Sequence, residues 1–550
     1  LLENLQNPDS PQYQQFLSTD QFIARFSPAT QDVDETVRYL TSMGLKIKSV
    51  PKNRLMIHAE GTVSQLEKAF NVTINEYSVD TIMNQSAVGQ PGAPDAVAPR
   101  FYMSNDRDPV LPIHLKDVVQ SVIGLNTYAQ MESRIARSKA PVKRVLAPAH
   151  TPQDIATAYN FPNSNNQNAP AKVFTGKGVK VAVATAYGYD IKDIEAYWKR
   201  HGIVRGGQLI DKPINGLSGK IEEETTLDLE LVSSQVPDAD VLMYIAVNPS
   251  FLNFALTFNQ VAIDNEALVM TVSWGLCERN TGWLMMKTEN MVFKQLAAQG
   301  IALFVSSGDD GAYDCKIKSK GKEVPKWAVD YPSSNPRFTA VGGTQLVLKA
   351  DGSWGSEKTW SGSGATGGGR SLRTPVPEYQ KDVVMPDNLN NPAFKGRGVP
   401  DIAGNADPRS GWNTYTDQGI SAIGGTSASA PAKAVAAAMI SQATGKPTGF
   451  WNPTLYRLGK TNPEVYHDIT VGNNTDGGVK GYPAGPGWDA STGWGSINIG
   501  KMIEVLKKEN SQHFVARGAR QVPGLIGDNH TSVPAWAIPY QGSVTNDQQK

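Results

Sequence analysis

A serine at the head of a small-residue segment is the first group in this sequence that could do chemistry. Residues 424–431 read Gly-Gly-Thr-Ser-Ala-Ser-Ala-Pro, and an alanine-rich run of good helix formers follows them. This order places the Ser427 hydroxyl at a helix N-terminus, beside outward-pointing backbone N–H groups and without a bulky neighbour. Pro431 fits a first helical turn, where proline is tolerated. The stretch predicts a serine nucleophile, although an N-capping serine in a glycine turn would show the same residues.

A serine nucleophile needs a base, and none of the seven histidines has a promising sequence context. Carboxylates are the alternative, because Glu224 and Asp228 lie four residues apart and a helix would place both on one face. Like charges at that spacing repel, so the pair would hold a proton and have a raised apparent pKa. A solvated acidic face would have the same spacing, but the leucines on both sides of Asp228 favour burial.

Another acid follows a predicted buried strand at residues 301–305. Asp309 comes directly after Gly308, where a protonated carboxyl group could donate to a developing oxyanion. A turn aspartate is the alternative, and Asp310 is a second candidate for the same role. Near the C-terminus, Asp468 and Asp489 flank a glycine-rich stretch, which fits either an oxygen-ligand calcium site or a cluster of turns.

The segments that must position these groups alternate between two types. Mostly apolar runs at residues 179–184, 241–246, 267–272 and 301–305 read as buried strands, and residues 225–234 and 284–299 read as helices. This alternation predicts an α/β domain with a parallel sheet covered by helices on both faces. Ligands of such sheets bind at the carboxyl ends of the strands, which is where Asp309 falls.

The first 125 residues have a different pattern. Helices are expected at 32–43 and 62–70 and strands at 45–50 and 54–59, which predicts a small α+β domain without a catalytic cluster. Residues 126–150 are basic and lack apolar periodicity, so they read as an exposed, easily cut linker. The second domain is expected to span residues 151–506, followed by a loosely packed tail at 507–550.

Composition excludes several classes of function. Lys and Arg together number 52, as do Asp and Glu, so the chain has no charge excess for nucleic acid or an anionic membrane. No apolar run approaches the roughly 18 residues of a membrane span. Cys277 and Cys315 could form a disulfide or stay free thiols. The sequence opens on Leu1, so a start and a signal peptide are expected to precede it.

Taken in order along the chain, these residues resemble the sedolisin family of serine-carboxyl peptidases. The motifs that carry the resemblance are Glu224-x-x-x-Asp228, Ser273-Trp274-Gly275, Gly308-Asp309-x-Gly311, Gly367-Gly368-Gly369, Arg397-Gly398-Val399-Pro400-Asp401, Gly424 to Pro431, and the pair Asp468 and Asp489. They cover residues 151–506. Residues 1–125 are similar to the activation prodomain of the family, for example at Asn53-Arg54-Leu55.

The resemblance implies a subtilisin-like fold in which carboxylates replace the histidine base. Ser427 would be the nucleophile, Glu224 the general base, Asp228 the residue that orients Glu224 and shares its proton, and Asp309 the oxyanion acid. Such a site would work in acid and lose activity toward neutral pH. The residues implied in substrate binding are Ser273, Trp274, Gly275, Gly367, Gly368 and Gly369.

The same resemblance implies one Ca²⁺, a disulfide and export from the cell. The calcium ligands would be the side chains of Asp468 and Asp489 and the carbonyl groups of Ile469, Gly485 and Gly487. Cys277 would pair with Cys315 in an oxidising compartment, outside the cell or in a periplasm.

We expect a monomeric zymogen that acts on proteins or peptides, with its own prodomain as inhibitor and chaperone and a maturation site near residues 144–151. The alternatives are an inactive, calcium-stabilised secreted binding protein of the same fold and a subtilisin-like peptidase with His201 as the base.

Overall fold

The computed structural model describes residues 1–79, 100–137, 149–169, 172–319, 322–362, 364–389, 391–416 and 419–519. Residues 1–507 form one compact unit, and the account below concerns that unit. Within the described residues, no helix combines the length and the apolar character needed to cross a membrane. The predicted tail is described only as far as the end of α13 (Ile499–Ala519), so its first part is helical.

An eight-stranded sheet forms the centre of the unit, as the apolar runs predicted. Seven strands follow the order β17-β16-β12-β10-β7-β9-β8, and β20 pairs with β16. All pairs are parallel except the edge pair β16–β17. The bounds are β7 (Lys180–Ala186), β8 (Leu209–Ile214), β9 (Asp240–Ala246), β10 (Val269–Val272), β12 (Ala302–Ser306), β16 (Phe338–Leu348), β17 (Trp354–Thr359) and β20 (Ile402–Asn405).

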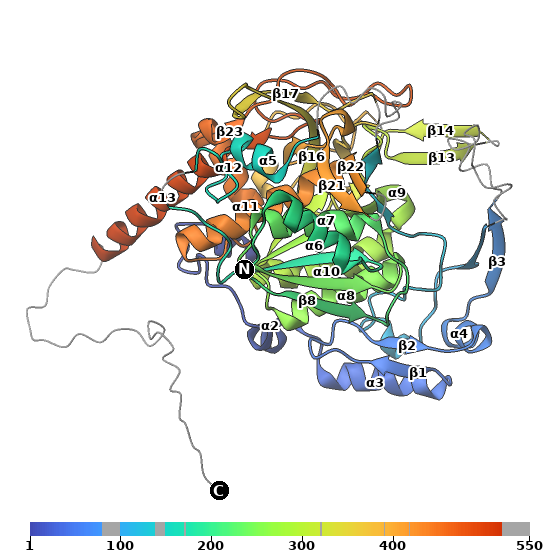
Figure 1. Ribbon diagram of the computed structural model, residues 1–550. Helices are drawn as coiled ribbons and strands as arrows, with labels where there is room; N and C mark the ends of the chain where they lie inside the picture. The colour runs from blue at the N-terminus through green and yellow to red at the C-terminus, as the bar shows by residue number, and fades with distance from the viewer. Residues whose placement is uncertain are drawn as a thin grey trace, which may run out of the picture. The chain divides into compact units, whose positions relative to one another are not determined.

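Helices cover both faces of this sheet (Figure 1). On one face lie α6 (Ile191–His201), α7 (Glu223–Gln235) and α11 (Thr426–Thr444), and on the other lie α8 (Phe251–Asp264) and α10 (Trp283–Ala298). The strands are apolar on both sides for this reason. Val181 and Val183 of β7 belong to the core beneath α7 and α11, and Ala182 and Ala184 belong to the core beneath α8 and α10.

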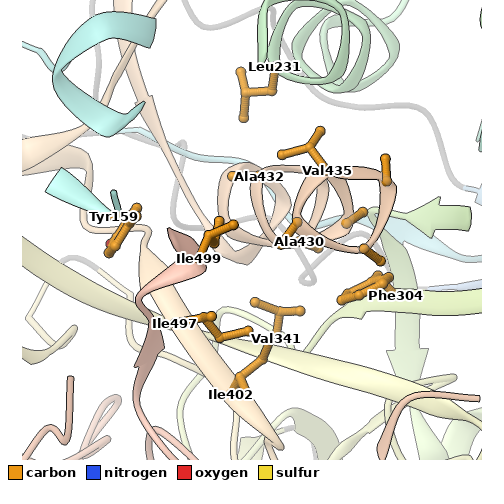
Figure 2. Close-up of a cluster of buried hydrophobic side chains, with 14 of the residues drawn as sticks. Tyr159, Leu231, Phe304, Val341, Ile402, Ala430, Ala432, Val435, Ile497 and Ile499 are labelled. Carbon is orange, nitrogen blue, oxygen red and sulfur yellow. The ribbon is translucent and has the colours of Figure 1, made fainter. Parts of the chain in front are cut away.

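The core beneath α11 shows why that helix is rich in small residues. Figure 2 shows Ala430 on the side of α11 that faces Phe304 of the sheet, and Val435 on the opposite side, which faces Leu231 of α7. Every residue from Thr426 to Ser441 is buried. A helix enclosed by a sheet and a second helix has room only for small side chains at many positions. The alanine-rich sequence therefore reflects burial on all sides.

The N-terminal segment folds into helices and short strand pairs close to the predicted ranges, except that the strand expected at 54–59 begins only at His58. Its elements are α1 (Leu2–Gln6), α2 (Thr19–Phe26), α3 (Thr30–Ser42), β1 (Lys46–Ser49), β2 (His58–Glu60), α4 (Val63–Phe70), β3 (Ile74–Val79) and β4 (Arg100–Asn105). This segment packs against α8 and α10. The side chain of Asn53, fully buried, donates to Asn259 Oδ1 at 2.6 Å and to Gln295 Oε1 at 2.9 Å. These bonds hold the N-terminal segment on α8 and α10, the two helices that cover one face of the sheet.

The remaining elements are loops, helices and short strands around the two ends of the sheet. They are β5 (Glu132–Ser133), β6 (Ala136–Arg137), α5 (Pro152–Ala158), β11 (Trp274–Cys277), α9 (Glu278–Thr281), β13 (Cys315–Ser319), β14 (Lys322–Lys326), β15 (Asp330–Tyr331), β18 (Gly369–Pro375), β19 (Gly396–Val399), β21 (Trp412–Thr416), β22 (Gly419–Gly424), α12 (Asn452–Thr461), β23 (Tyr466–His467) and β24 (Ser496–Ile497). Of these, β5, β6, β11, β15 and β22 surround Ser427.

Candidate active site

The predicted nucleophile lies where β22 turns into α11. Gly425 has φ +96°, a value that favours glycine, and α11 begins at the next residue. Pro431 is the sixth residue of α11 and lies inside the helix, so its expected place in the first turn is wrong. Its missing N–H leaves the Ser427 carbonyl without an intrahelical donor, and Ser273 Oγ lies 3.4 Å from that oxygen. The carbonyl that the proline leaves without a partner in α11 is thus contacted by the residue directly before β11.

Glu224 is the partner of the serine hydroxyl. Ser427 Oγ donates to Glu224 Oε2 at 2.8 Å, and the carbonyl of Ser273 lies 3.2 Å from the same hydroxyl. Both side chains are fully buried. Burial, followed by repulsion from Asp228, raises the pKa of Glu224 well above its ordinary value. The structure therefore brings together the serine and carboxylate that the sequence predicted, although they are about 200 residues apart.

Asp228 lies one turn further along α7 and is also buried. Its Oδ1 accepts from Ser273 Oγ at 2.6 Å. Burial raises the pKa of Asp228 to about 8, and the hydrogen bond from Ser273 opposes this shift. Glu224 Oε1 and Asp228 Oδ2 are buried and have no hydrogen-bond partner among the described residues. Two like charges on neighbouring buried carboxyl groups repel, so ionising both would cost much free energy. The pair is therefore most stable when the two groups share one proton.

Asp309 approaches the serine from the end of β12. Its Oδ1 accepts from both the backbone N–H and the hydroxyl of Thr426, each at 2.8 Å. The other oxygen, Oδ2, is buried without a partner among the described residues. A Cβ atom at Gly425 would stand 2.7 Å from this oxygen. Burial raises the pKa of Asp309 to about 7, so the carboxyl group holds a proton in acid, and Oδ2 is the oxygen with no bond to accept.

A segment of the chain itself passes through this space. β5 pairs with β11 in antiparallel register, Ser133 opposite Trp274, and β6 pairs with β22, Ala136 opposite Gly424. Arg134 lies between the two short strands and is 5% exposed. The exposure expected for residues 126–150 is therefore wrong at Met131 and Arg134, which are buried, although residues 126–128, 132 and 137 are exposed. A basic, proline-containing composition does not reveal that a folded domain holds the segment in a groove.

The backbone of Arg134 contacts both Ser427 and Glu224. Its carbonyl accepts from the Ser427 N–H at 3.1 Å, and its N–H donates to the Ser273 carbonyl at 3.2 Å and to Glu224 Oε2 at 3.1 Å. A Cβ atom at Gly425 would stand 2.1 Å from the Arg134 carbonyl oxygen. Only glycine leaves room for a peptide carbonyl at this point.

The predicted substrate-binding residues divide into two groups. Ser273, Trp274 and Gly275 border the groove, because they supply the strand that pairs with β5. The glycines at 367–369 lie behind Asp309: the N–H of Gly367 donates to the Gly308 carbonyl, and Ser307 Oγ donates to the Gly367 carbonyl. A direct role of these three glycines in binding stays a prediction.

His201 is not near the serine, so the histidine-base alternative is wrong. It ends α6, and its ring packs against Tyr197 with centroids 4.6 Å apart. Its Nε2 is buried without a hydrogen-bond partner among the described residues, and burial lowers the pKa of His201. Among the described residues, the hydroxyl of Ser427 has Glu224 and Ser273 as its hydrogen-bond partners.

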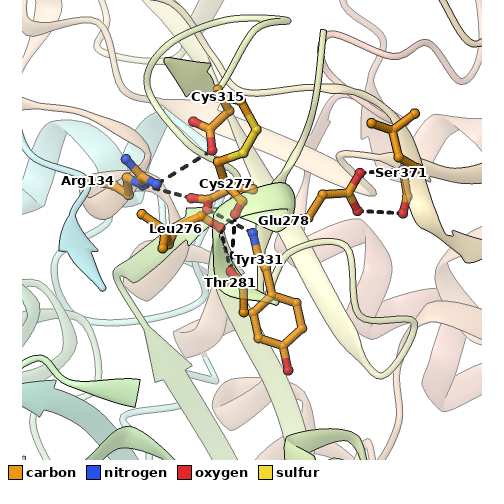
Figure 3. The surroundings of a disulfide bond; sticks show 11 residues. Arg134, Leu276, Cys277, Glu278, Thr281, Cys315, Tyr331 and Ser371 are labelled. Carbon is orange, nitrogen blue, oxygen red and sulfur yellow. Dashed lines mark hydrogen bonds and ion pairs between the residues drawn. A yellow bond between two sulfur atoms is a disulfide. The ribbon is translucent and has the colours of Figure 1, made fainter. Parts of the chain in front are cut away.

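The predicted disulfide between Cys277 and Cys315 is confirmed. It lies beside the groove, and Figure 3 shows the guanidinium of Arg134 facing two carboxylates next to it. These are Asp330, whose Oδ2 is 2.7 Å from Arg134 Nε, and Asp314, whose Oδ2 is 3.6 Å from the terminal nitrogen. Sequence reasoning missed all three charged residues. The adjacency of Asp314 to Cys315 was the one available signal.

The five predicted calcium ligands come together in one cluster of loops. Asp468 Oδ2 accepts from the Gly487 N–H at 2.8 Å, and Asp489 Oδ2 accepts from the Gly485 N–H at 3.3 Å. Asp489 also accepts from Ser491 and Thr492, so hydrogen bonds alone can account for its position. In the described ranges, no group of three or more His, Cys, Asp or Glu side chains could hold a metal. A cation here would need two carboxylates and backbone carbonyls, a donor set that suits Ca²⁺ in kind.

Comparison with known proteins agrees with this site. The family profile described as "Pro-kumamolisin, activation domain" matches residues 1–128, and the profile "Subtilase family" matches residues 158–495. The chain is 31% identical to kumamolisin of Bacillus sp. (strain MN-32) over 519 residues, which cover 92% of this chain and 88% of kumamolisin. It is 28% identical to sedolisin of Pseudomonas sp. (strain 101) over 538 residues, which cover 93% and 85% of the two chains.

A solved structure is similar as well. Pseudomonas sedolisin, a serine-carboxyl proteinase complexed with two molecules of pseudo-iodotyrostatin, matches with a TM-score of 0.57 and 29% identity. The match covers 66% of this chain and 99% of that one. The profiles, relatives and subtilisin-like sheet agree with the arrangement around Ser427. The chain belongs to the sedolisin family of serine-carboxyl peptidases, with an N-terminal activation prodomain.

Proposed function

We propose that the chain is the zymogen of an acid-acting endopeptidase that cleaves peptide bonds through an acyl-enzyme on Ser427. One observation carries the proposal: Ser427 donates its hydroxyl hydrogen to Glu224 while its backbone N–H binds the carbonyl of a peptide segment lying in the groove. A nucleophile paired with a base, beside a peptide carbonyl in an oxyanion site, is the arrangement that acyl transfer requires.

In acylation, Ser427 Oγ bonds to the carbonyl carbon of the substrate and Glu224 takes the hydroxyl proton. The charge that develops on the carbonyl oxygen is stabilised by the Ser427 N–H and by the protonated Oδ2 of Asp309. Glu224 then gives its proton to the leaving nitrogen as the C–N bond breaks. Water attacks the ester with Glu224 again as base, which releases the acid product and restores the serine. Asp228 positions Glu224 and shares its proton.

These roles predict a two-sided pH dependence. While the Glu224–Asp228 pair holds two protons, Glu224 cannot act as a base, so one proton must leave first. Burial raises the pKa of both groups and therefore displaces this acid-side limit toward neutral pH. As pH rises through about 7, Asp309 loses the proton that it must donate. Above that point kcat/KM should fall about tenfold for each pH unit. Hydrolysis of an unfolded protein, measured from pH 3 to 9 after acid incubation, tests this; a chain that stays inert, or is most active above pH 8, contradicts the proposal.

The upper side of this profile can be assigned with the substitution Asp309→Asn. The amide oxygen can still accept from Thr426, and its NH₂ group then stands at the place of Oδ2 and donates at every pH. We expect the variant to keep measurable activity and to lose the decrease above about pH 7. If the variant and the parent decline together with pH, a group other than Asp309 sets that limit.

We further propose that the loop cluster of Asp468 and Asp489 holds one Ca²⁺ with the carbonyls of Ile469, Gly485 and Gly487. The ion would neutralise two carboxylates and connect the two loops that carry them. Raising free Ca²⁺ to 100 times its Kd should stabilise the fold by about 2.7 kcal/mol relative to EDTA. Thermal unfolding with and without EDTA measures this, with Mg²⁺ as the control ion. An unchanged Tm, or the same shift in Asp468→Ala, contradicts the site.

The disulfide and the prodomain support export as a zymogen. A disulfide persists in oxidising compartments, which favours the outside of the cell or a periplasm. The prodomain packs on α8 and α10 through Asn53 and continues into the groove, so one covalent segment supports the sheet and blocks the site. The maturation site predicted near residues 144–151 lies mostly outside the described residues and stays a prediction.

A further inference from the structure

The segment in the groove presents one peptide bond to the catalytic groups. β5 holds the chain on one side of Ser427 and β6 holds it on the other, so the chain passes the nucleophile in extended form. The carbonyl between them, that of Arg134, accepts from the Ser427 N–H. It shares the space over Gly425 with Oδ2 of Asp309. The bond from Arg134 to Ile135 therefore occupies the position of a bond about to be cleaved.

The side chain of Arg134 enters an acidic pocket. Its guanidinium is 5% exposed and lies between Asp330, at 2.7 Å, and Asp314, at 3.6 Å. The two carboxylates are 1% and 0% exposed. A third carboxylate, Glu132, is 3.7 Å away but is mostly exposed to solvent. Burial raises the pKa of both aspartates, and repulsion from Asp330 raises that of Asp314 further, so in acid the pair shares a proton. The remaining charge, which lies next to Arg134, is costly to bury unless paired, so the pocket suits a cation and disfavours neutral side chains.

The pocket is built into the framework of the groove. Asp330 of β15 lies opposite Cys277 of β11, and Asp314 directly precedes Cys315, the first residue of β13. The disulfide therefore joins the strand that pairs with Asp330 to the residue that follows Asp314. A Cβ atom at Gly275 would stand 2.4 Å from Asp330 Oδ2, so glycine leaves the space that this carboxylate fills. The acids are fixed by covalent and backbone contacts independently of Arg134.

We propose that Asp314 and Asp330 form a specificity pocket for arginine on the acyl side of the scissile bond, and that the chain makes its first self-cleavage between Arg134 and Ile135. This rests on the proposed peptidase function. Ser427 Oγ bonds to the Arg134 carbonyl carbon, Glu224 passes the hydroxyl proton to the Ile135 nitrogen as the C–N bond breaks, and water hydrolyses the ester. The products are a carboxylate at Arg134 and an amine at Ile135.

Peptides that differ only in the residue before the cleaved bond test the pocket without any substitution in the protein. The acid-processed enzyme is assayed with arginine, citrulline or leucine at that position. Citrulline has the shape of arginine without its charge, so we expect kcat/KM for arginine to be at least about 100-fold higher than for citrulline. Equal rates for arginine and citrulline overturn the pocket.

Substitutions of the two aspartates then test whether they cause the preference for arginine. Asp314→Asn and Asp330→Asn should each reduce the arginine-to-citrulline ratio at least tenfold. Glu289→Gln is the matched control, since Glu289 is also a fully buried carboxylate but lies on α10. An arginine preference that survives both aspartate substitutions overturns their assignment.

The first self-cleavage is followed by intact mass in a short acid time course. The earliest N-terminal fragment should end at Arg134, and Arg134→Ala should delay its appearance at least tenfold, whereas later trimming near residue 144 does not change that fragment. An earliest fragment that ends elsewhere overturns the cleavage site. A chain that hydrolyses casein without preferring arginine refutes only this inference. A chain that hydrolyses nothing refutes the proposed function as well.

Discussion

Replacing Ser427 by alanine should reduce peptide hydrolysis by about 10⁴- to 10⁶-fold and leave the acid-incubated chain at full length. The acyl-enzyme forms on the Ser427 hydroxyl oxygen, which the variant lacks. The backbone N–H that binds the Arg134 carbonyl remains in the variant. The variant should therefore still bind the segment around Arg134 but should not cleave it. Casein hydrolysis and intact mass after acid incubation measure the two effects together.

Ser429→Ala is the matched control for that experiment. Ser429 lies on the same helix, is equally buried, and donates to the Gly342 carbonyl at 2.9 Å, away from the groove. Its loss should lower stability by about 1 kcal/mol and leave processing intact. If Ser427→Ala still processes itself, the nucleophile lies elsewhere. Ser427 then only caps the helix, which is the alternative that the sequence left open.

Glu224→Gln should lower kcat by about 10²- to 10⁴-fold at every pH, because an amide cannot take the proton of the serine hydroxyl. The amide has the size of the carboxyl group, and the variant removes a buried charge, so the fold should persist. Measured kcat from pH 3 to 7, with circular dichroism to verify folding, gives the result.

Glu230→Gln controls for the removal of a buried carboxyl group from the same helix. Glu230 is buried, accepts from the Tyr415 N–H at 3.1 Å, and has a pKa raised well above its ordinary value by burial. A neutral amide therefore resembles its native form closely. Activity of Glu230→Gln should stay within about threefold of the parent. Equal losses in the two variants would mean that Glu224 acts through stability rather than as a base.

The placement of Glu224 and Asp228 on one face of a helix could be predicted, because it depends only on neighbouring residues in the sequence. Four residues separate Glu224 from Asp228, and any helix then aligns them; leucines around Asp228 indicate burial directly. Strands of the sheet were predictable for the same reason, since burial on both faces makes them continuously apolar. Asp309 followed from its position after such a strand, where parallel sheets present their functional groups.

Arg134 shows what local patterns cannot provide. Its burial depends on Asp314 and Asp330, which lie about 180 and 200 residues further along the chain, and on a pairing of two short strands that has no periodic signal. Taken alone, a basic stretch with alanine and proline is typical of a linker. Pro431 is a similar case: a propensity rule places proline in a first turn, but a tertiary contact with Ser273 accommodates it deeper in the helix.

The covalent continuity of the groove segment has a consequence for kinetics. Because the segment and the nucleophile belong to one chain, their encounter rate does not depend on protein concentration, and activation should be first-order under strong dilution. Each molecule performs one turnover on itself before it can act on others. After that turnover the Arg134 end is no longer tethered beside Ser427, so its effective concentration drops and dilution favours its departure. Dilution into the medium would then keep the cleaved segment from binding again and inhibiting the enzyme.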